Sequence, residues 1–110
     1  MLLNKVSSAV DEVYFDPGFL VLIESHLTQL RKNPNVGYAG INEHQNYKYE
    51  GDLYGLLDDL NIEKKFHFIV ARLNHYEHSG DFKGDASTLM LPDFNEIELL
   101  KSVYQTKNQF

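Results

Sequence analysis

Residues 47–93 read YKYEGDLYGLLDDLNIEKKFHFIVARLNHYEHSGDFKGDASTLMLPD, and this stretch holds the most regular pattern in the chain. Residues 47–50 alternate aromatic and polar side chains, which is typical of a short strand. Gly51 interrupts the alternation, and Asp52 is suited to cap a helix. Residues 87–91, STLML, again favour a strand. We therefore expect a strand at each end of this stretch and helices between them.

Two short amphipathic helices are expected between those strands. Leucines spaced three and four apart predict the first helix, which ends at Asn61. Apolar residues at the same spacing predict the second, which ends at Asn74. Their apolar faces are Leu53, Leu56, Leu57 and Leu60 in the first, and Phe66, Ile69, Val70 and Leu73 in the second.

The segments on either side of residues 47–93 are also predicted to be helical. Asp16 and Pro17 suit the cap and first position of a helix over residues 17–32. Residues 33–46, rich in asparagine and glycine, are interpreted as a linker. Asp93 and Glu96 have the spacing of a capping box, and they introduce a C-terminal helix with an apolar face formed by Phe94, Ile97, Leu100 and Tyr104.

The first residues of the chain form a further amphipathic pattern. Leu2, Leu3, Val6 and Val10 recur at helical spacing among polar residues, which predicts a helical arm. Such an arm needs a surface on which to bury these side chains. Two alternatives stay open: the arm folds back onto the helix of residues 17–32, or it docks on a partner.

The order strand, GD, leucine helix, helix ending in LN, polar loop, strand ending in LP resembles a LysM domain. That resemblance covers residues 47–93 and implies an α+β fold in which a two-stranded sheet carries two helices, βααβ. The chain then divides into an N-terminal helical arm and linker (1–46), the LysM-like module (47–93) and a C-terminal helix (94–110). LysM-like modules flanked by extra helices also occur in small wedge proteins of phage contractile-tail baseplates, and the whole chain resembles those proteins.

Composition restricts the classes of function. A chain of 110 residues with 43% hydrophobic residues suits one small domain, and the lack of cysteine excludes disulfides and thiolate zinc sites. A net charge of −6 without a basic cluster argues against nucleic-acid partners. No signal peptide and no run of 18 apolar residues is present in this sequence, so we expect no membrane partner and synthesis in the cytoplasm.

The resemblance and the unburied arm favour a virion structural protein, a baseplate wedge component assembled in the host cytoplasm that joins other virion or baseplate proteins. No catalytic or cofactor-binding residue is expected, because no nucleophile elbow, phosphate loop or zinc-helix motif is present. The expected protein–protein contact residues are Leu2, Leu3, Val6, Val10, Tyr54, Tyr76, Phe82, Phe94, Ile97, Leu100 and Tyr104.

The alternative function is that of a LysM module that binds N-acetylglucosamine polymers, peptidoglycan or chitin. The resemblance places the glycan along residues 51–54 and 75–87, where Tyr54, Tyr76 and Phe82 could stack on sugar rings. The acidic charge of the chain and the long second loop argue against this alternative.

The loop HYEHSGDFKGD, residues 75–85, carries side chains that could bind a metal ion. His75 and His78 are three residues apart, with Glu77, Asp81 and Asp85 nearby. The stretch lacks the alternating ligands of an EF-hand and contains a lysine, so we favour a solvated contact loop without a metal. His67, between two phenylalanines, is expected to be a partly buried packing residue.

Overall fold

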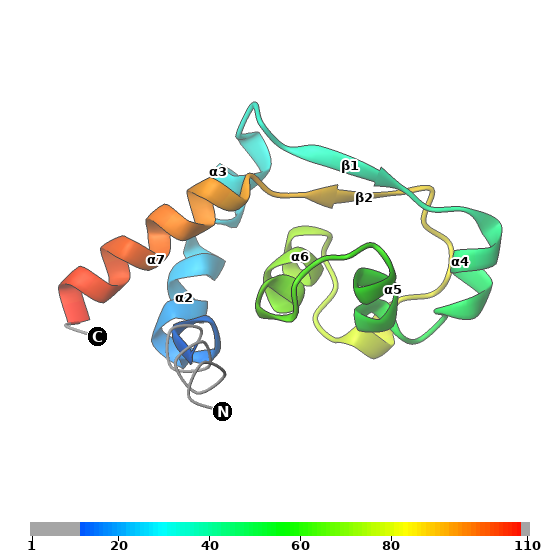
Figure 1. Cartoon of the computed structure of the whole chain (residues 1–110), viewed down its shortest axis with the longest axis horizontal. Coiled ribbons are helices and arrows are strands. Elements are labelled where there is room, and N and C mark those ends of the chain that lie inside the picture. The colour runs from blue at the N-terminus through cyan, green and yellow to red at the C-terminus, as the bar shows by residue number, and fades with distance from the viewer. Residues whose placement is uncertain (1–11, 109–110) are drawn as a thin grey trace.

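Two short strands far apart in the sequence form the sheet of this computed structural model, which describes residues 12–108. Strand β1 (Gly37–Gly40) pairs antiparallel with β2 (Thr88–Leu91), and the register sets Tyr38 opposite Met90. With helices making up most of the rest, the predicted α+β class is confirmed. Figure 1 shows the sheet along one side of the molecule, with α5 and α6 on its inner side.

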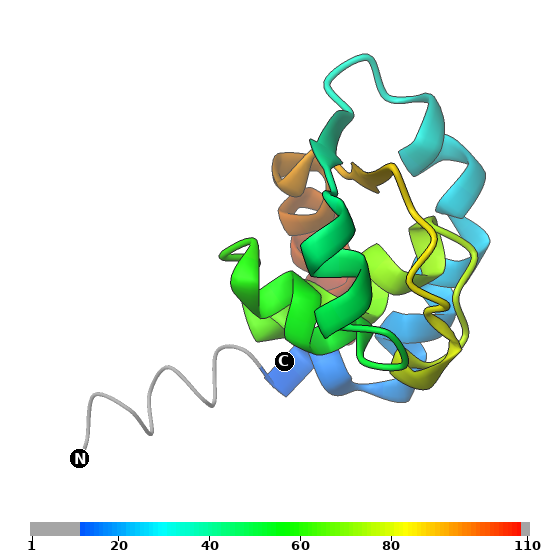
Figure 2. The same ribbon diagram turned by 90° about the vertical axis from the view of Figure 1, so that its right-hand side faces the viewer.

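Three helices rather than two connect the strands. The connection contains α4 (Glu43–Lys48), α5 (Leu53–Asp59), the 3-10 turn η2 (Lys64–Phe66), α6 (His67–Leu73) and the 3-10 turn η3 (Ser79–Asp81). The elements η1 (Glu12–Phe15), α2 (Pro17–Ser25) and α3 (Leu27–Lys32) precede β1, and α7 (Phe94–Asn108) follows β2. Figure 2, seen from the α4 side, shows α4 running beside the segment that leads into β2.

The prediction of a strand at residues 47–50 was wrong. Residues 47 and 48 belong to helix α4 and residues 49 and 50 form a turn after it. The helix starts at a capping box, in which Asn42 Oδ1 accepts from Gln45 N and Gln45 Oε1 accepts from Asn42 N. The first strand lies instead at Gly37–Gly40, inside the predicted linker. The first strand therefore lies about ten residues earlier than expected, and the additional helix α4 stands between it and α5. The observed order is β1, α4, α5, α6, β2 instead of βααβ.

The helix predicted over residues 17–32 exists but is divided. Asp16 caps α2 by accepting from Phe19 N, and Pro17 occupies the first turn, as expected. At His26 the backbone leaves helical geometry, and the imidazole Nδ1 lies 2.8 Å from Leu22 O. The chain bends there before α3, so α2 and α3 are separate helices.

The other predicted helices and the second strand lie close to their expected positions, with one difference at the start of α7. Asp93 Oδ1 accepts from Asn95 N, one position earlier than in a capping box. The Glu96 carboxylate instead accepts hydrogen bonds from Asn33 Nδ2 and Gln29 Nε2, at 3.0 and 3.1 Å. Glu96 therefore connects α7 to the α3 region and does not cap its own helix.

One continuous core joins most elements of the described chain, and α4 and β1 contribute no buried residue to it. Its fully buried members come from η1, α2, α3, α5, α6, β2 and α7, including Tyr14, Phe19, Ile23, Leu30, Leu53, Leu56, Ile69, Leu73, Leu89 and Ile97. Arg31 of α3 adds a polar connection, since its guanidinium donates to Arg72 O and Leu73 O at the C-terminal end of α6, both at 3.0 Å. The helices outside residues 47–93 are thus packed on the same core as those inside.

Two asparagine side chains form hydrogen bonds with the backbone of β2 and of the residues before it, on the side that faces away from β1. Asn74, directly after α6, accepts from Met90 N at 2.7 Å and donates to Met90 O at 2.9 Å. Asn46 of α4 makes the same pair of bonds with Ala86, at 3.2 and 2.8 Å. Each amide therefore binds one backbone N–H and one backbone C=O, as a neighbouring strand would.

Replacing Asn74 by alanine is expected to destabilise the fold by about 1–3 kcal/mol, because both backbone groups of Met90 lose a partner. The free energy of unfolding, measured by denaturant titration, tests this. Asn95→Ala is the matched control, since Asn95 is exposed and its bond to Asp93 Oδ1 is donated by the backbone N–H, which alanine retains. Equal stability of the two variants would contradict the role given to Asn74.

A charged cluster covers the outer side of Tyr14. Glu98 lies 2.9 Å from Lys101 Nζ and 3.7 Å from Lys65 Nζ, and both ammonium groups lie over the Tyr14 ring. Burial raises the pKa of Glu98, but hydrogen bonds from Lys101 and Tyr14 and the two positive charges outweigh it and lower the pKa below its ordinary value of 4.5. The folded state therefore favours the ionised carboxylate.

A lowered folded-state pKa predicts stability that is present above the unfolded-state pKa and is lost as pH falls through the folded value. Acidification from about pH 6 to about pH 3 is therefore expected to destabilise the wild type more than Glu98→Gln, which cannot ionise. Unfolding free energies at a series of pH values provide the measurement. Glu50→Gln, at an exposed position, should retain the wild-type pH dependence.

Candidate functional site

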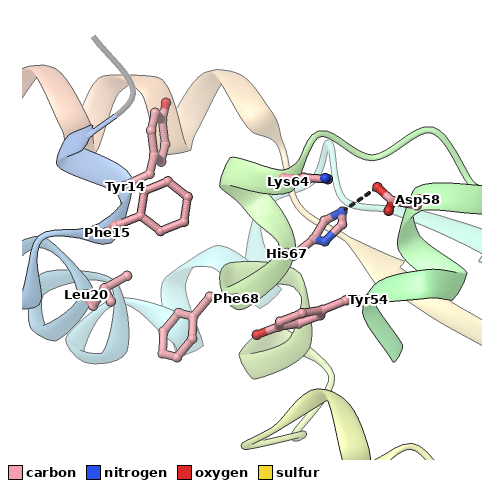
Figure 3. A pocket seen from close by; sticks show the side chains of 8 residues that line it. All are labelled: Tyr14, Phe15, Leu20, Tyr54, Asp58, Lys64, His67 and Phe68. Carbon is pink, nitrogen blue, oxygen red and sulfur yellow. Dashed lines mark ion pairs between the residues drawn. The ribbon is translucent and has the colours of Figure 1, made fainter. Parts of the chain in front are cut away.

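A largely apolar pocket of about 500 Å³ lies where η1 and α2 meet α5, η2 and α6. Figure 3 shows the side chains around it, and we refer to it as the η1–α6 pocket. Its wall is formed by Tyr14, Phe15, Leu20, Tyr54, Asp58, Lys64, His67 and Phe68. Its size is within the range of ligand pockets.

The aromatic wall on the η1 side is fixed by the start of α2. The Asp16 carboxylate caps α2 and also accepts a hydrogen bond from the Tyr104 hydroxyl of α7, which raises the pKa of Tyr104. Tyr14 stands edge-on to Phe19 and Phe66, with ring centroids 5.7 and 5.3 Å apart. Phe15 follows directly and is 63% exposed at the pocket rim.

The opposite wall comes from α5 and α6. Asp52 caps α5 by accepting from Gly55 N, and Ser79 Oγ of η3 accepts from Tyr54 N. The Tyr54 ring tilts against the His67 imidazole, with centroids 5.3 Å apart. Burial raises the pKa of Tyr54, so its phenol stays protonated near neutral pH and suits hydrogen bonding more than proton abstraction.

His67 and Asp58 form the polar end of the pocket. His67 is 5% exposed, and its Nε2 lies 2.8 Å from Ile62 O and 3.7 Å from Asp58 Oδ1. A carbonyl oxygen only accepts hydrogen bonds, so Nε2 carries a proton. His67 is a buried packing residue, as expected from the sequence, and its ring also binds the backbone of Ile62, before η2.

The contact residues predicted in the loops are only partly available to a partner. Tyr54 and Tyr76 are half-buried, and Phe82 is 1% exposed, edge-on to Tyr76 at 5.8 Å. Phe82 is therefore a core residue, and its assignment as a contact or sugar-stacking residue was wrong. Its ring belongs to the core, and its backbone O accepts from Gly51 N at 2.7 Å.

The predicted contact face of α7 is its buried face. Ile97 and Leu100 belong to the core, while Phe94 and Tyr104 are half-buried against it, so this face packs within the chain. The apolar residues that α7 exposes are Leu99 and Val103, at 63% and 44%. Leu2, Leu3, Val6 and Val10 lie outside the described residues.

The loop HYEHSGDFKGD forms a short turn that is stabilised by its own residues. Asp81 Oδ2 accepts from His78 N at the start of η3, and His75 has a positive φ of 70°. Within residues 12–108, no group of three or more His, Asp or Glu side chains is placed to hold a metal ion.

The outer edge of β1 is a feature that the sequence interpretation missed. Ile41 N donates to Ser87 O, and because bonding residues alternate in an antiparallel pair, the N–H and C=O of Tyr38 point away from β2. Gly37, Tyr38 and Gly40 are exposed there. Val36 and Tyr38, two residues apart, have the spacing of one face of a strand and could have indicated it.

Comparisons with protein-family models, with curated proteins and with solved structures found no match to this chain. In the described part of the chain, no helix has the length and apolar character required to span a bilayer.

His67→Phe is expected to destabilise the protein by about 1–3 kcal/mol, because Ile62 O loses its donor while the ring volume is retained. The shift of the denaturation midpoint is the measurement. His44→Phe, on the exposed surface of α4, is the control and should leave the midpoint nearly unchanged. A midpoint for His67→Phe equal to that of the control would show that the hydrogen bond does not stabilise the fold.

Proposed function

We propose that this chain is a non-catalytic structural subunit of a macromolecular assembly and that a neighbouring protein adds a strand to the outer edge of β1. The observation that carries this proposal is the asymmetry of the sheet. Asn46 and Asn74 bind the outward backbone groups of Ala86 and Met90, whereas the outward groups of Tyr38 have no such side chain on them among residues 12–108.

The open edge suits a protein partner for physical reasons. A two-stranded sheet is marginal by itself, and an unpaired strand edge offers regular N–H and C=O groups to another chain. Strand addition uses these groups for affinity and exposed side chains for specificity. Tyr38, 64% exposed at the centre of β1, provides a large amphipathic side chain for such a contact.

The finer part of the proposal is a component of a phage tail baseplate wedge, located in the virion. It is supported by the part of the LysM resemblance that does not depend on the wrongly predicted strand at residues 47–50: the GD before α5, the LN at the end of α6 and the strand ending in LP. The LN landmark at residues 73–74 has a physical role compatible with that resemblance, since Asn74 binds the strand that closes the module.

Glycan binding is the second candidate function, and one observation favours it. The two loops that the LysM resemblance assigns to a glycan do meet, since Gly51 N donates to Phe82 O and Tyr54 N to Ser79 Oγ. These bonds also weigh against it, because they occupy amides that would otherwise be free to bind acetamido groups.

Strand addition predicts that Tyr38→Pro weakens the complex with a partner at least about tenfold, since proline removes the outward N–H while the bonds to β2 remain. The chain would be co-expressed with baseplate proteins of contractile phage tails, and the affinity of the purified complex measured. Tyr38→Phe, which retains the backbone donor and the ring, is the matched control and should bind like the wild type. Circular dichroism and melting curves would verify that both variants are folded.

A second measurement separates assembly from glycan binding. The purified chain is mixed with insoluble peptidoglycan and sedimented, and its oligomeric state is measured alone. Saturable pelleting of a well-behaved monomer that forms no complex with tail proteins would overturn the proposal in favour of glycan binding. A stoichiometric complex without pelleting supports assembly.

A further inference from the structure

We propose that the strand added to the outer edge of β1 is the β1 of a second copy of this chain, in antiparallel orientation. In this pairing Tyr38 of each copy lies opposite Gly40 of the other. The inference rests on the proposed function, because it names the partner that the open edge receives. In Figure 1, β1 lies at the margin of the molecule with β2 on its inner side, and three of its four residues are exposed.

The backbone groups on the outer edge of β1 determine which strand fits. Because Ile41 N bonds to Ser87 O directly opposite, the N–H and C=O groups of Tyr38 and Gly40 point away from β2. Among residues 12–108, no backbone or side-chain group forms a hydrogen bond with these outward groups. Tyr38 and Gly40 therefore offer two donors and two acceptors to another strand.

These groups select one register for two identical strands. With Tyr38 opposite Gly40, each of the two residue pairs exchanges both backbone bonds, and every outward group of Tyr38 and Gly40 is used. With Tyr38 opposite Tyr38, Gly40 O would face Val36 N, which already donates to Asn33 O at 3.1 Å. With Gly40 opposite Gly40, Tyr38 O would face Asn42 N, which is bonded within its own capping box.

The side chains of β1 fit the same register. Tyr38 and Gly40 lie on the outer face of the sheet, because side chains alternate along a strand and the half-buried Ala39 lies on the inner face. A Cβ atom added to Gly40 would meet nothing within 4 Å. The space over Gly40 is thus open to the Tyr38 ring of the second copy, and an aromatic side chain opposite a glycine stabilises a strand edge.

The charges around β1 permit two acidic molecules to approach at this edge. The chain has a net charge of −6, yet residues 33–42 contain no Asp, Glu, Lys, Arg or His. Charged side chains commonly protect strand edges from pairing, and β1 has none. Antiparallel pairing also brings Lys32, before this segment, to the end where Glu43 follows it in the other copy. Asp93, near the same end as Lys32, accepts hydrogen bonds from two asparagines of the segment.

Cysteine pairing tests the register, because the chain contains no cysteine. In the proposed register Ala39 faces Ala39 of the second copy as a non-hydrogen-bonded pair, with Cα atoms about 4.5 Å apart. Ala39→Cys should therefore form a disulfide-linked dimer on mild oxidation. Gly37→Cys, on the same strand and face, is the matched control. Its two Cα atoms would lie more than about 13 Å apart, so it should oxidise at least about tenfold more slowly.

The oxidation rates are read from non-reducing gels, and mass spectrometry identifies the linked peptides. Equal rates for Ala39→Cys and Gly37→Cys would overturn the proposal, because random collisions do not distinguish the two positions.

Sedimentation equilibrium of the cysteine-free chain gives an independent result. The wild type should change from monomer to dimer as its concentration rises. Tyr38→Pro should raise the dissociation constant of the dimer at least about tenfold, because each copy loses one hydrogen bond. Tyr38→Phe, which retains the backbone N–H and the ring, is the matched control and should dimerise like the wild type.

The same measurements separate this inference from the proposed function. A chain that stays monomeric at every concentration overturns the second copy as the occupant of the edge. If Tyr38→Pro then still weakens a complex with baseplate proteins, another protein adds the strand and the proposed function stands. If Tyr38→Pro changes neither association, both proposals are overturned.

Discussion

The amide of Asn74 connects the main parts of this fold. It follows α6 directly, donates to Val70 O in that helix and to Met90 O in β2, and accepts from Met90 N. Arg31 reaches the same end of α6 from α3 by donating to Arg72 O and Leu73 O. The C-terminal end of α6 is thus the point where the N-terminal helices, the central helices and the sheet meet, and a short two-stranded sheet depends on such external contacts.

Local patterns predicted the elements whose apolar residues have a clear period. The leucines of α5, the apolar face of α6, the start of α2 at Asp16 and the β-prone residues of β2 were all identified. The region of β1 and α4 was not. The alternation of Tyr47 and Tyr49 is typical of a strand, but the capping box at Asn42 and Gln45 starts a helix there. The glycines of β1 are typical of a linker, and this segment becomes a strand only through its pairing with the distant β2.

Predicting the contact surface from the sequence was harder, because exposure depends on tertiary packing. An apolar stripe on a helix identifies a face that is buried somewhere, and in α7 that face, with Ile97 and Leu100, is covered by the chain itself. Aromatic residues in a polar loop likewise suggest a recognition surface, yet the Phe82 ring lies in the core. The η1–α6 pocket combines residues from five elements, and Tyr54 is the one lining residue that the sequence predicted to contact a partner.

The two asparagines beside β2 also limit how far the sheet can grow. Because Asn46 and Asn74 occupy one side of it, strands can be added only next to β1. Even if two molecules joined through their β1 edges, the resulting sheet would end in an asparagine-covered edge on both sides. Such a pairing is closed, so the exposed edge that suits a partner does not permit open-ended fibres.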